Sequence, residues 1–142
     1  MVLFARDIVE KDFLVMPRGT TVLQAAKAMK DNRHGFVVIG SRSRPEGIVT
    51  EWDVLAKVVA EGRDPAAVKL EDIMSTELVS VRAEDGIAAV SQIMSSKGVR
   101  RVLVMKGDEV IGVITSKTVL AHLKDYVDKV SAQISRLQAP WF

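Results

Sequence analysis

The chain has 142 residues, a length that accommodates one domain or two small ones and suffices to bury a sizeable core. Hydrophobic residues make up 48% and charged residues 27%, a globular composition that excludes a disordered chain. The net charge of +2 argues against nucleic-acid or membrane binding by bulk charge. The absence of cysteine excludes disulfides and a cysteine nucleophile, and the presence of only two histidines argues against a multi-histidine metal site.

The first segment, residues 1–11, carries Arg6, Asp7 and Glu10 and therefore lacks the apolar core of a signal peptide. No stretch of the sequence approaches the length of a membrane span. We therefore expect a cytoplasmic protein with no membrane segment.

The rest of the chain repeats itself. Gly112-Val113-Ile114-Thr115 repeats the pattern of Gly47-Ile48-Val49-Thr50, and further matches along the chain keep the same offset without a gap. In each copy the pattern predicts a first strand (13–16 or 78–81), an amphipathic helix (22–29 or 87–94) and a second strand (36–39 or 102–105). A polar turn, a third strand ending at Thr50 or Thr115 and a helix follow. The sequence thus predicts a duplicated β-α-β-β-α unit of the mixed α/β class.

The domain organisation follows from this duplication. We expect a first repeat over residues 1–60, a linker over 61–69 in which Gly62 and Pro65 stop the helix, and a second repeat over 70–124. Since a half-domain of about 55 residues is marginal alone, the two copies are expected to pack their sheets into one core. A tail over 125–142 carries an apolar helical stripe, which can pack on its own domain or contact another subunit.

The repeated motif resembles a known family. The stretch Gly47-Ile48-Val49-Thr50-Glu51-Trp52-Asp53 is similar to the signature of CBS domains, the modules named after cystathionine beta-synthase. Pro65, Asp72-Ile73-Met74 and Val99-Arg100-Arg101-Val102 fit the same pattern, and the resemblance covers residues 5–124. It implies a tandem pair with pseudo-twofold symmetry that binds AMP, ADP or ATP, less often S-adenosylmethionine, and regulates rather than catalyses. It also implies a disc-like homodimer.

Thr50 and Asp53 are the first candidate ligand residues. Thr50 ends a strand and opens a helix, where unpaired backbone N–H groups attract a phosphate. The Asp53 carboxylate, three residues on, can accept hydrogen bonds from the two hydroxyls of a ribose. The same spacing also fits a helix capping box with Asp in place of Glu, and the two interpretations are compatible.

The basic residues of the second copy are the phosphate candidates. The pseudo-twofold of the resembling modules brings the two clefts together, so Arg100, Arg101 and Lys117 are expected to reach a phosphate held by the first copy. Val99 and the strand that contains Ser80 are expected to contact the adenine.

The second copy predicts a weaker cleft lined by Gly35, Phe36, Thr115 and Thr118. Thr118 stands where the first copy has Asp53, so the ribose carboxylate is expected to be missing there. Replacing a charged acceptor by a neutral one costs about 1–2 kcal/mol, which corresponds to about tenfold weaker binding or more.

These residues bear on three functions. The first is an adenine-nucleotide-binding, energy-sensing regulatory module that signals to an unidentified effector protein or to another copy of itself. The second is a ligand-independent dimerisation scaffold in which Thr50 and Asp53 only cap a helix. The third, an enzyme, is not expected, because the sequence shows no nucleophile with a base, no metal set and no phosphate-binding glycine loop. No required cofactor and no nucleic-acid partner are expected either.

Overall fold

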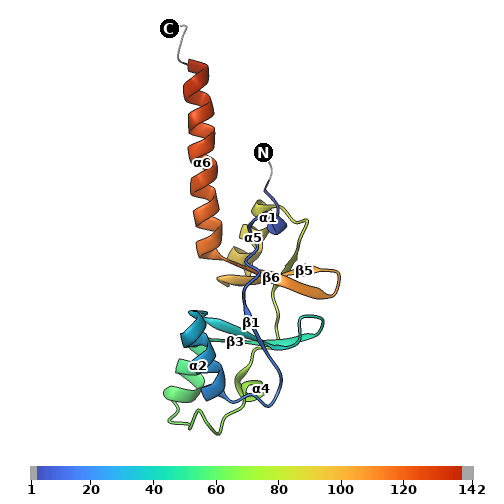
Figure 1. Cartoon of the computed structure of the whole chain (residues 1–142), viewed down its shortest axis with the longest axis vertical. Coiled ribbons are helices and arrows are strands. Elements are labelled where there is room, and N and C mark those ends of the chain that lie inside the picture. Colours follow the sequence, from blue (N-terminus) through green and yellow to red (C-terminus); the bar gives the residue numbers. More distant parts are fainter. Residues whose placement is uncertain (1–2, 139–142) are drawn as a thin grey trace.

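The computed structural model describes residues 3–138, while residues 1–2 and 139–142, at the outer ends of the first repeat and the tail, lie outside the described part. Within it the strands form two three-stranded sheets (Figure 1). In each sheet the first strand is parallel to the second, which is antiparallel to the third. The sheets contain β1 (Leu14–Met16), β2 (Phe36–Gly40) and β3 (Pro45–Thr50), and β4 (Ser80–Arg82), β5 (Arg101–Lys106) and β6 (Glu109–Thr115).

The helices repeat with the same offset as the sequence. The short helix α1 (Ala5–Ile8) and the longer α2 (Val22–Asn32) have counterparts in the second copy, α4 (Leu70–Ile73) and α5 (Ile87–Lys97). After β3 the chain forms α3 (Glu51–Val54) and a π-helical segment, η1 (Leu55–Val59), and after β6 it forms the long helix α6 (Ser116–Gln138). The predicted mixed α/β class with two repeated units is confirmed.

The strands separate two kinds of apolar layer, because successive strand residues point to opposite faces of a sheet. In β2, Val37 and Ile39 lie in the core of the first repeat, whereas Phe36 and Val38 lie in the core between the two sheets. The layer between the sheets takes residues from both repeats: Phe13, Phe36, Val38, Leu103, Val110 and Val113. The predicted packing of the two sheets into one core is thus confirmed.

The segment that leads into each repeat packs on the other repeat. Ala5 and Ile8 of α1 are buried in the core of the second repeat. Leu70 and Ile73 of α4, their equivalents, are buried in the core of the first. The sequence pattern did not predict this exchange, which joins the repeats through both of their leading segments.

Two backbone contacts fix the exchanged segments. Glu10 and Val113 exchange two hydrogen bonds of 2.9 Å, and Ser75 and Ile48 exchange two more of the same length. Ser75 is the equivalent of Glu10 in the other copy, and Val113 is the equivalent of Ile48. Each contact is therefore the counterpart of the other, as the predicted pseudo-twofold symmetry requires.

The two glycines of the repeated motif make room for these contacts. A Cβ atom on Gly47 would lie 2.5 Å from Met74 Sδ and 3.0 Å from the Ser75 carbonyl oxygen. A Cβ atom on Gly112 would collide with the Val9 side chain and the backbone of Glu10. The glycines are needed because another backbone passes directly over them.

Helix α6 runs as one element beyond the second repeat and away from the first (Figure 1). The sequence predicted a helix through Leu123 and a separate tail from residue 125. The helix does not stop there, because Val127 and Val130 occupy the positions that Gly62 and Pro65 occupy in the first copy. Among residues 3–138, no helix combines the length and apolarity of a membrane span.

Glu71 of α4 gives a first prediction. Its carboxylate accepts hydrogen bonds of 2.9 and 3.1 Å from the Gly19 N–H, and this donor lowers the pKa of Glu71 below its ordinary 4.5. A depressed folded-state pKa gives stability that is present above the unfolded value and lost as pH falls through the folded one. Between about pH 6 and about pH 3, denaturant titrations should therefore show a slightly larger stability loss for the wild type than for Glu71→Gln. Equal losses would contradict this role.

Candidate functional site

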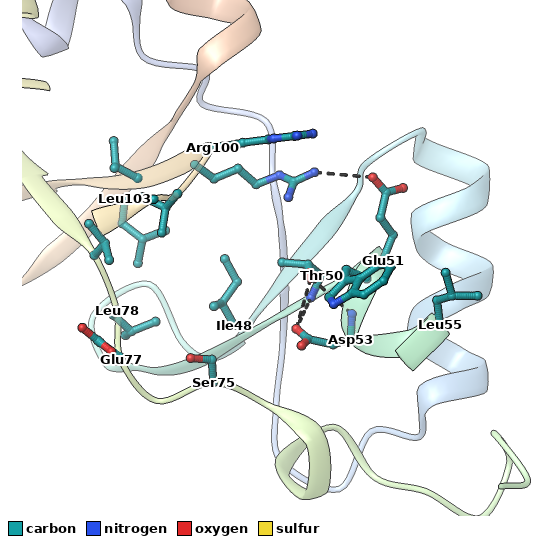
Figure 2. A pocket seen from close by; sticks show the side chains of 16 residues that line it. Ile48, Thr50, Glu51, Asp53, Leu55, Ser75, Glu77, Leu78, Arg100 and Leu103 are labelled. Carbon is teal, nitrogen blue, oxygen red and sulfur yellow. Dashed lines mark hydrogen bonds and ion pairs between the residues drawn. The ribbon is translucent and has the colours of Figure 1, made fainter. Parts of the chain in front are cut away.

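A cavity of about 920 Å³ opens between the two repeats, and we call it the first cleft (Figure 2). It lies between the end of β3 with the start of α3 on one side and the segment leading into β5 on the other. The segment between α4 and β4 closes a third side. Its lining residues are Ile48, Thr50, Glu51, Trp52, Asp53, Leu55, Ser75, Glu77, Leu78, Val79, Gly98, Val99, Arg100, Arg101, Val102 and Leu103.

Thr50 and Asp53 form a helix cap at the mouth of this cleft. The Asp53 carboxylate accepts hydrogen bonds from the Thr50 N–H at 2.9 Å and from the Thr50 hydroxyl at 3.1 Å. The Asp53 N–H donates in turn to the Thr50 hydroxyl at 3.4 Å. The predicted capping box is therefore confirmed, and it holds the carboxylate at the cleft wall in a fixed orientation.

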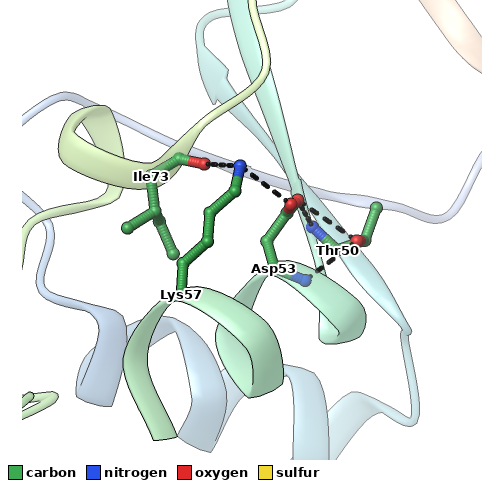
Figure 3. Close-up of polar contacts among 4 residues, drawn as sticks. All are labelled: Thr50, Asp53, Lys57 and Ile73. Carbon is green, nitrogen blue, oxygen red and sulfur yellow. Dashed lines mark hydrogen bonds and ion pairs between the residues drawn. The ribbon is translucent and has the colours of Figure 1, made fainter. Parts of the chain in front are cut away.

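Lys57 joins this cap to the exchanged segment (Figure 3). Its ammonium group lies 3.1 Å from the second oxygen of Asp53, Oδ1, and donates a 2.9 Å hydrogen bond to the Ile73 carbonyl oxygen. A carboxylate offers about four acceptor positions. Thr50 uses two on Oδ2 and Lys57 uses one on Oδ1, so about one position on Oδ1 stays open to a ligand hydroxyl.

The cationic side of the cleft consists of Arg100 and Arg101. Arg101 Nη2 lies 3.6 Å from Glu51 Oε1, and its guanidinium carbon lies 5.6 Å from the centre of the Phe36 ring. Arg100 is exposed and forms no ion pair with another residue between 3 and 138. Glu77, the third carboxylate on the lining besides Glu51 and Asp53, lies 3.8 Å from the Lys97 ammonium group. Arg100, which also borders a second cavity described below, is therefore the cation of this cleft that is available to an anionic ligand.

The remaining wall is apolar. Ile48, Leu78, Val79 and Val99 are partly buried and face the cavity from both repeats. A cavity of this size that combines an apolar wall with converging polar groups is typical of small-molecule sites. The apolar wall and the polar groups of Asp53 and the arginines line the same cavity.

A smaller cavity of about 500 Å³ occupies the pseudo-symmetric position, and we call it the second cleft. The Thr115 and Thr118 hydroxyls lie 2.9 Å apart, and the Thr118 N–H donates to Thr115 Oγ1 at 3.2 Å. The Thr118 hydroxyl also donates to the Glu10 carboxylate. The lining residues are Glu10, Arg33, His34, Gly35, Phe36, Arg100, Arg101, Thr115, Ser116, Lys117, Thr118, Ala121 and His122.

Glu10 corrects one expectation. The second cleft was expected to lack a carboxylate because Thr118 replaces Asp53. The exchanged leading segment supplies one instead, since Glu10 lies on the cleft where its equivalent in the other copy, Ser75, lies on the first cleft. The two clefts therefore differ in volume and in the element that carries the carboxylate. In the second cleft, the Thr118 hydroxyl is already hydrogen-bonded to Glu10.

The structure brings five of the seven residues predicted for the first cleft to its lining: Thr50, Asp53, Val99, Arg100 and Arg101. Lys117 lines the second cleft instead, because it belongs to the first turn of α6, which borders that cavity. Ser80 lies on neither lining; it is exposed in β4, and the two residues before it, Leu78 and Val79, face the first cleft. All four residues predicted for the second cleft line it: Gly35, Phe36, Thr115 and Thr118.

Sequence reasoning missed several polar residues on or beside the clefts, among them Ser75, Glu10 and Lys57. Ser75 and Glu10 reach them only through the exchange of the leading segments. Lys57 was also missed, although its position four residues after Asp53 on the same helical segment was a usable signal.

Comparison with known proteins finds similar sequences and similar structures. A family model of the CBS domain matches the chain twice, over residues 5–60 and 70–125. Hypoxic response protein 1 of Mycobacterium tuberculosis is 27% identical over 123 residues, which cover 86% of each chain.

Two solved structures share the architecture. The hexameric CBS-CP12 protein of bloom-forming cyanobacteria is 32% identical, with a TM-score of 0.78 over 84% of this chain and 67% of that one. The CBS domain pair of protein MJ0100, solved in complex with 5′-methylthioadenosine and S-adenosyl-L-methionine, is 21% identical, with a TM-score of 0.78 over 89% of this chain and 99% of that one. At 21% identity, the similarity to protein MJ0100 concerns the fold alone.

Proposed function

This chain belongs to the CBS-domain family as a tandem pair, and from that premise we propose that it is a regulatory module whose first cleft binds an adenine nucleotide. The observation that carries the proposal is the convergence of Asp53, Arg100 and an apolar wall on one cavity of about 920 Å³ between the repeats. Each group matches a different part of the ligand, and only the packed pair of repeats brings them together.

The ligand is assigned part by part. The ribose lies at Asp53, where Oδ1 has an acceptor position open to a hydroxyl. The phosphate lies at Arg100, whose planar guanidinium can donate two parallel hydrogen bonds to it. The adenine lies against Val79 and Val99. The complex of protein MJ0100 with two adenosyl ligands supports this class of ligand, and S-adenosylmethionine is the less favoured alternative to AMP, ADP or ATP.

Signalling would follow from the position of the cleft. A ligand there touches α3 of the first repeat and the segment before β5 of the second, so it stabilises one arrangement of the repeats over others. We propose a separate effector protein, or a second copy of the chain, as the receiver in the cytoplasm. The second cleft is proposed to bind the same ligand more weakly, because it is smaller and the Thr118 hydroxyl is already bonded to Glu10.

A thermal-shift panel tests the ligand class. At one hundred times its dissociation constant a ligand stabilises the fold by about 2.7 kcal/mol, which raises the unfolding midpoint by several degrees for a chain of this length. We expect this shift with AMP, ADP or ATP and a much smaller one with GMP or GTP. Equal shifts with adenine and guanine nucleotides, or none with either, would contradict the proposal.

Arg100 gives a second test, of the phosphate. Arg100→Gln is expected to weaken AMP binding up to about fivefold, because an exposed ion pair is worth about 1 kcal/mol or less. The affinity for adenosine should not change. Lys117→Gln is the matched control, since Lys117 lines the second cleft. Titration calorimetry would contradict the assignment if Arg100→Gln weakened AMP and adenosine equally, or if Lys117→Gln had the larger effect on AMP.

The alternative function is a ligand-independent scaffold. The hydrogen bonds of Thr50 and Asp53 and the Lys57 contact account for these residues without any ligand. In that case substitution of Asp53 would change stability but no ligand affinity.

A further inference from the structure

The long helix α6 carries an apolar seam along its whole length. Its apolar residues are spaced three and four apart without interruption, the a and d pattern of a coiled coil. This seam consists of Leu120, Val127 and Ile134 at a and Leu123, Val130 and Leu137 at d. We call these six residues the α6 seam.

The seam is not covered by its own chain. Leu120 is 67% exposed, Val127 57% and Leu137 69%. Figure 1 shows why: most of α6 extends beyond the globular part, with no described element beside it. The stripe therefore does not pack on its own domain, which was one of the two outcomes left open by the sequence. A continuous exposed apolar stripe of this kind marks an interaction surface.

The occupant is identified by the pattern itself. A strict repeat with a mean spacing of about 3.5 residues matches a second helix with the same repeat, which two copies of one chain provide. Two of the three a residues are β-branched and two of the three d residues are leucine, the combination that favours parallel two-stranded coiled coils. The flanking e and g positions 124, 126, 131 and 133 hold a single charged residue, Lys124, whose ammonium lies 3.5 Å from Asp128 of the same helix. In a parallel pair Lys124 faces Val119 of the other helix, so no like charges meet.

A membrane surface fits the helix less well. Helices that lie on anionic lipid carry mostly Lys and Arg on their polar face. The polar face of α6 mixes Asp125 and Asp128 with Lys129 and Arg136.

A second exposed stripe sets the direction of pairing. Trp52, Leu55 and Val59 lie exposed on α3 and η1, and Leu55 is the equivalent of Leu120 in the first repeat. Because α6 runs along the long axis of the molecule (Figure 1), two parallel α6 helices place each repeat beside its own copy. The α3 stripes of the two copies then lie at the same level along the helix pair. Antiparallel helices would put the globular parts at opposite ends and leave the α3 stripe exposed.

We propose that the α6 seams of two copies form a parallel, in-register, two-stranded coiled coil that sets corresponding repeats side by side. The pairing gives a defined dimer in which a movement of the repeats also moves the paired α6 helices. It does not depend on whether the first cleft binds a nucleotide.

The first test is the mass of the full chain in solution by light scattering at micromolar concentration. The wild type is expected to be a dimer. Val127→Asp, which places a charge at a central a position, is expected to be a monomer with unchanged helix content by circular dichroism. Ala132→Asp is the matched control, since position 132 is an outward f position of the same helix, and it should remain a dimer. A monomeric wild type, with or without binding to lipid vesicles, or a dimeric Val127→Asp would overturn the proposal.

The second test determines the relative orientation of the two α6 helices. Because the chain has no native cysteine, a single introduced cysteine reports it by disulfide formation. Under mild oxidation, Leu137→Cys should form a disulfide with its own copy, whereas Ser135→Cys, on the outer side of the helix, should not. A parallel pair keeps position 137 away from position 120 of the partner helix. Preferential mixed disulfides between Leu120→Cys and Leu137→Cys chains would show an antiparallel pair and overturn the parallel one.

Discussion

Asp53→Asn is expected to weaken AMP binding to the first cleft at least about tenfold. Asparagine keeps an oxygen that can accept from the Thr50 N–H but removes the negative charge. The amide nitrogen then takes the place of Oδ1, and because it is a donor it cannot accept from a ribose hydroxyl. The lost hydrogen bond to a charged acceptor is worth about 1.5–3 kcal/mol, which sets the expected loss. Titration calorimetry of AMP on the wild type and the variant measures it.

The same variant separates ligand binding from capping. Asp53→Ala also removes the cap, so its stability is expected to fall by about 0.5–2 kcal/mol. Asp53→Asn should fall less, while its AMP affinity falls nearly as much as that of Asp53→Ala. Thr118→Ala, at the equivalent position in the second cleft, should leave the stronger AMP site unchanged. If Asp53→Asn bound AMP like the wild type, the scaffold function would be favoured over the sensor.

Gly112→Ala is expected to be the most destabilising of the single substitutions considered, by about 2–4 kcal/mol. The added Cβ collides with the backbone of Glu10, which cannot move away without breaking its two 2.9 Å hydrogen bonds with Val113. Gly47→Ala should cost less, because its nearest contact is the flexible side chain of Met74. Urea denaturation of the two variants measures both losses.

Gly86→Ala is the control for these two variants. Its φ of −73° suits any residue, and the nearest atom to an added Cβ lies at 3.9 Å. We expect a loss below about 1 kcal/mol there, the range for a changed helix cap. If Gly112→Ala were as stable as Gly86→Ala, the close approach of the leading segment to the second sheet would not hold in solution.

The repeat and its elements could be predicted because the signals are local and doubled. The alternating apolar residues of β2 and the helical spacing from Val22 are both visible in a short window, and each recurs in the second copy. The exchange of α1 and α4 could not be predicted, since a four-residue helix with two small or apolar contacts, Ala5 and Ile8, does not say on which sheet it packs.

The candidate site also contains residues that could be predicted from the sequence and residues that could not. Thr50 and Asp53 belong to the local motif, and Arg100 was predicted from the pseudo-twofold that the resemblance implies. Glu10 and Ser75 were missed because they reach the clefts through the exchanged segments, which are distant in sequence from the motif. Lys117 was predicted for the first cleft and lines the second, because the pseudo-twofold alone does not say how far the first turn of α6 reaches.

At low concentration, AMP is expected to occupy the first cleft and not the second. The most direct measurement is a titration of the ¹⁵N-labelled full chain with AMP, followed by the amide signals of Thr50, Asp53 and Val99 on one side and Thr115 and Thr118 on the other. We predict saturable shifts of the first three signals while the last two stay unchanged. Shifts at Thr115 and Thr118 without shifts at Thr50 and Asp53, or no shifts at any of the five, would contradict the account.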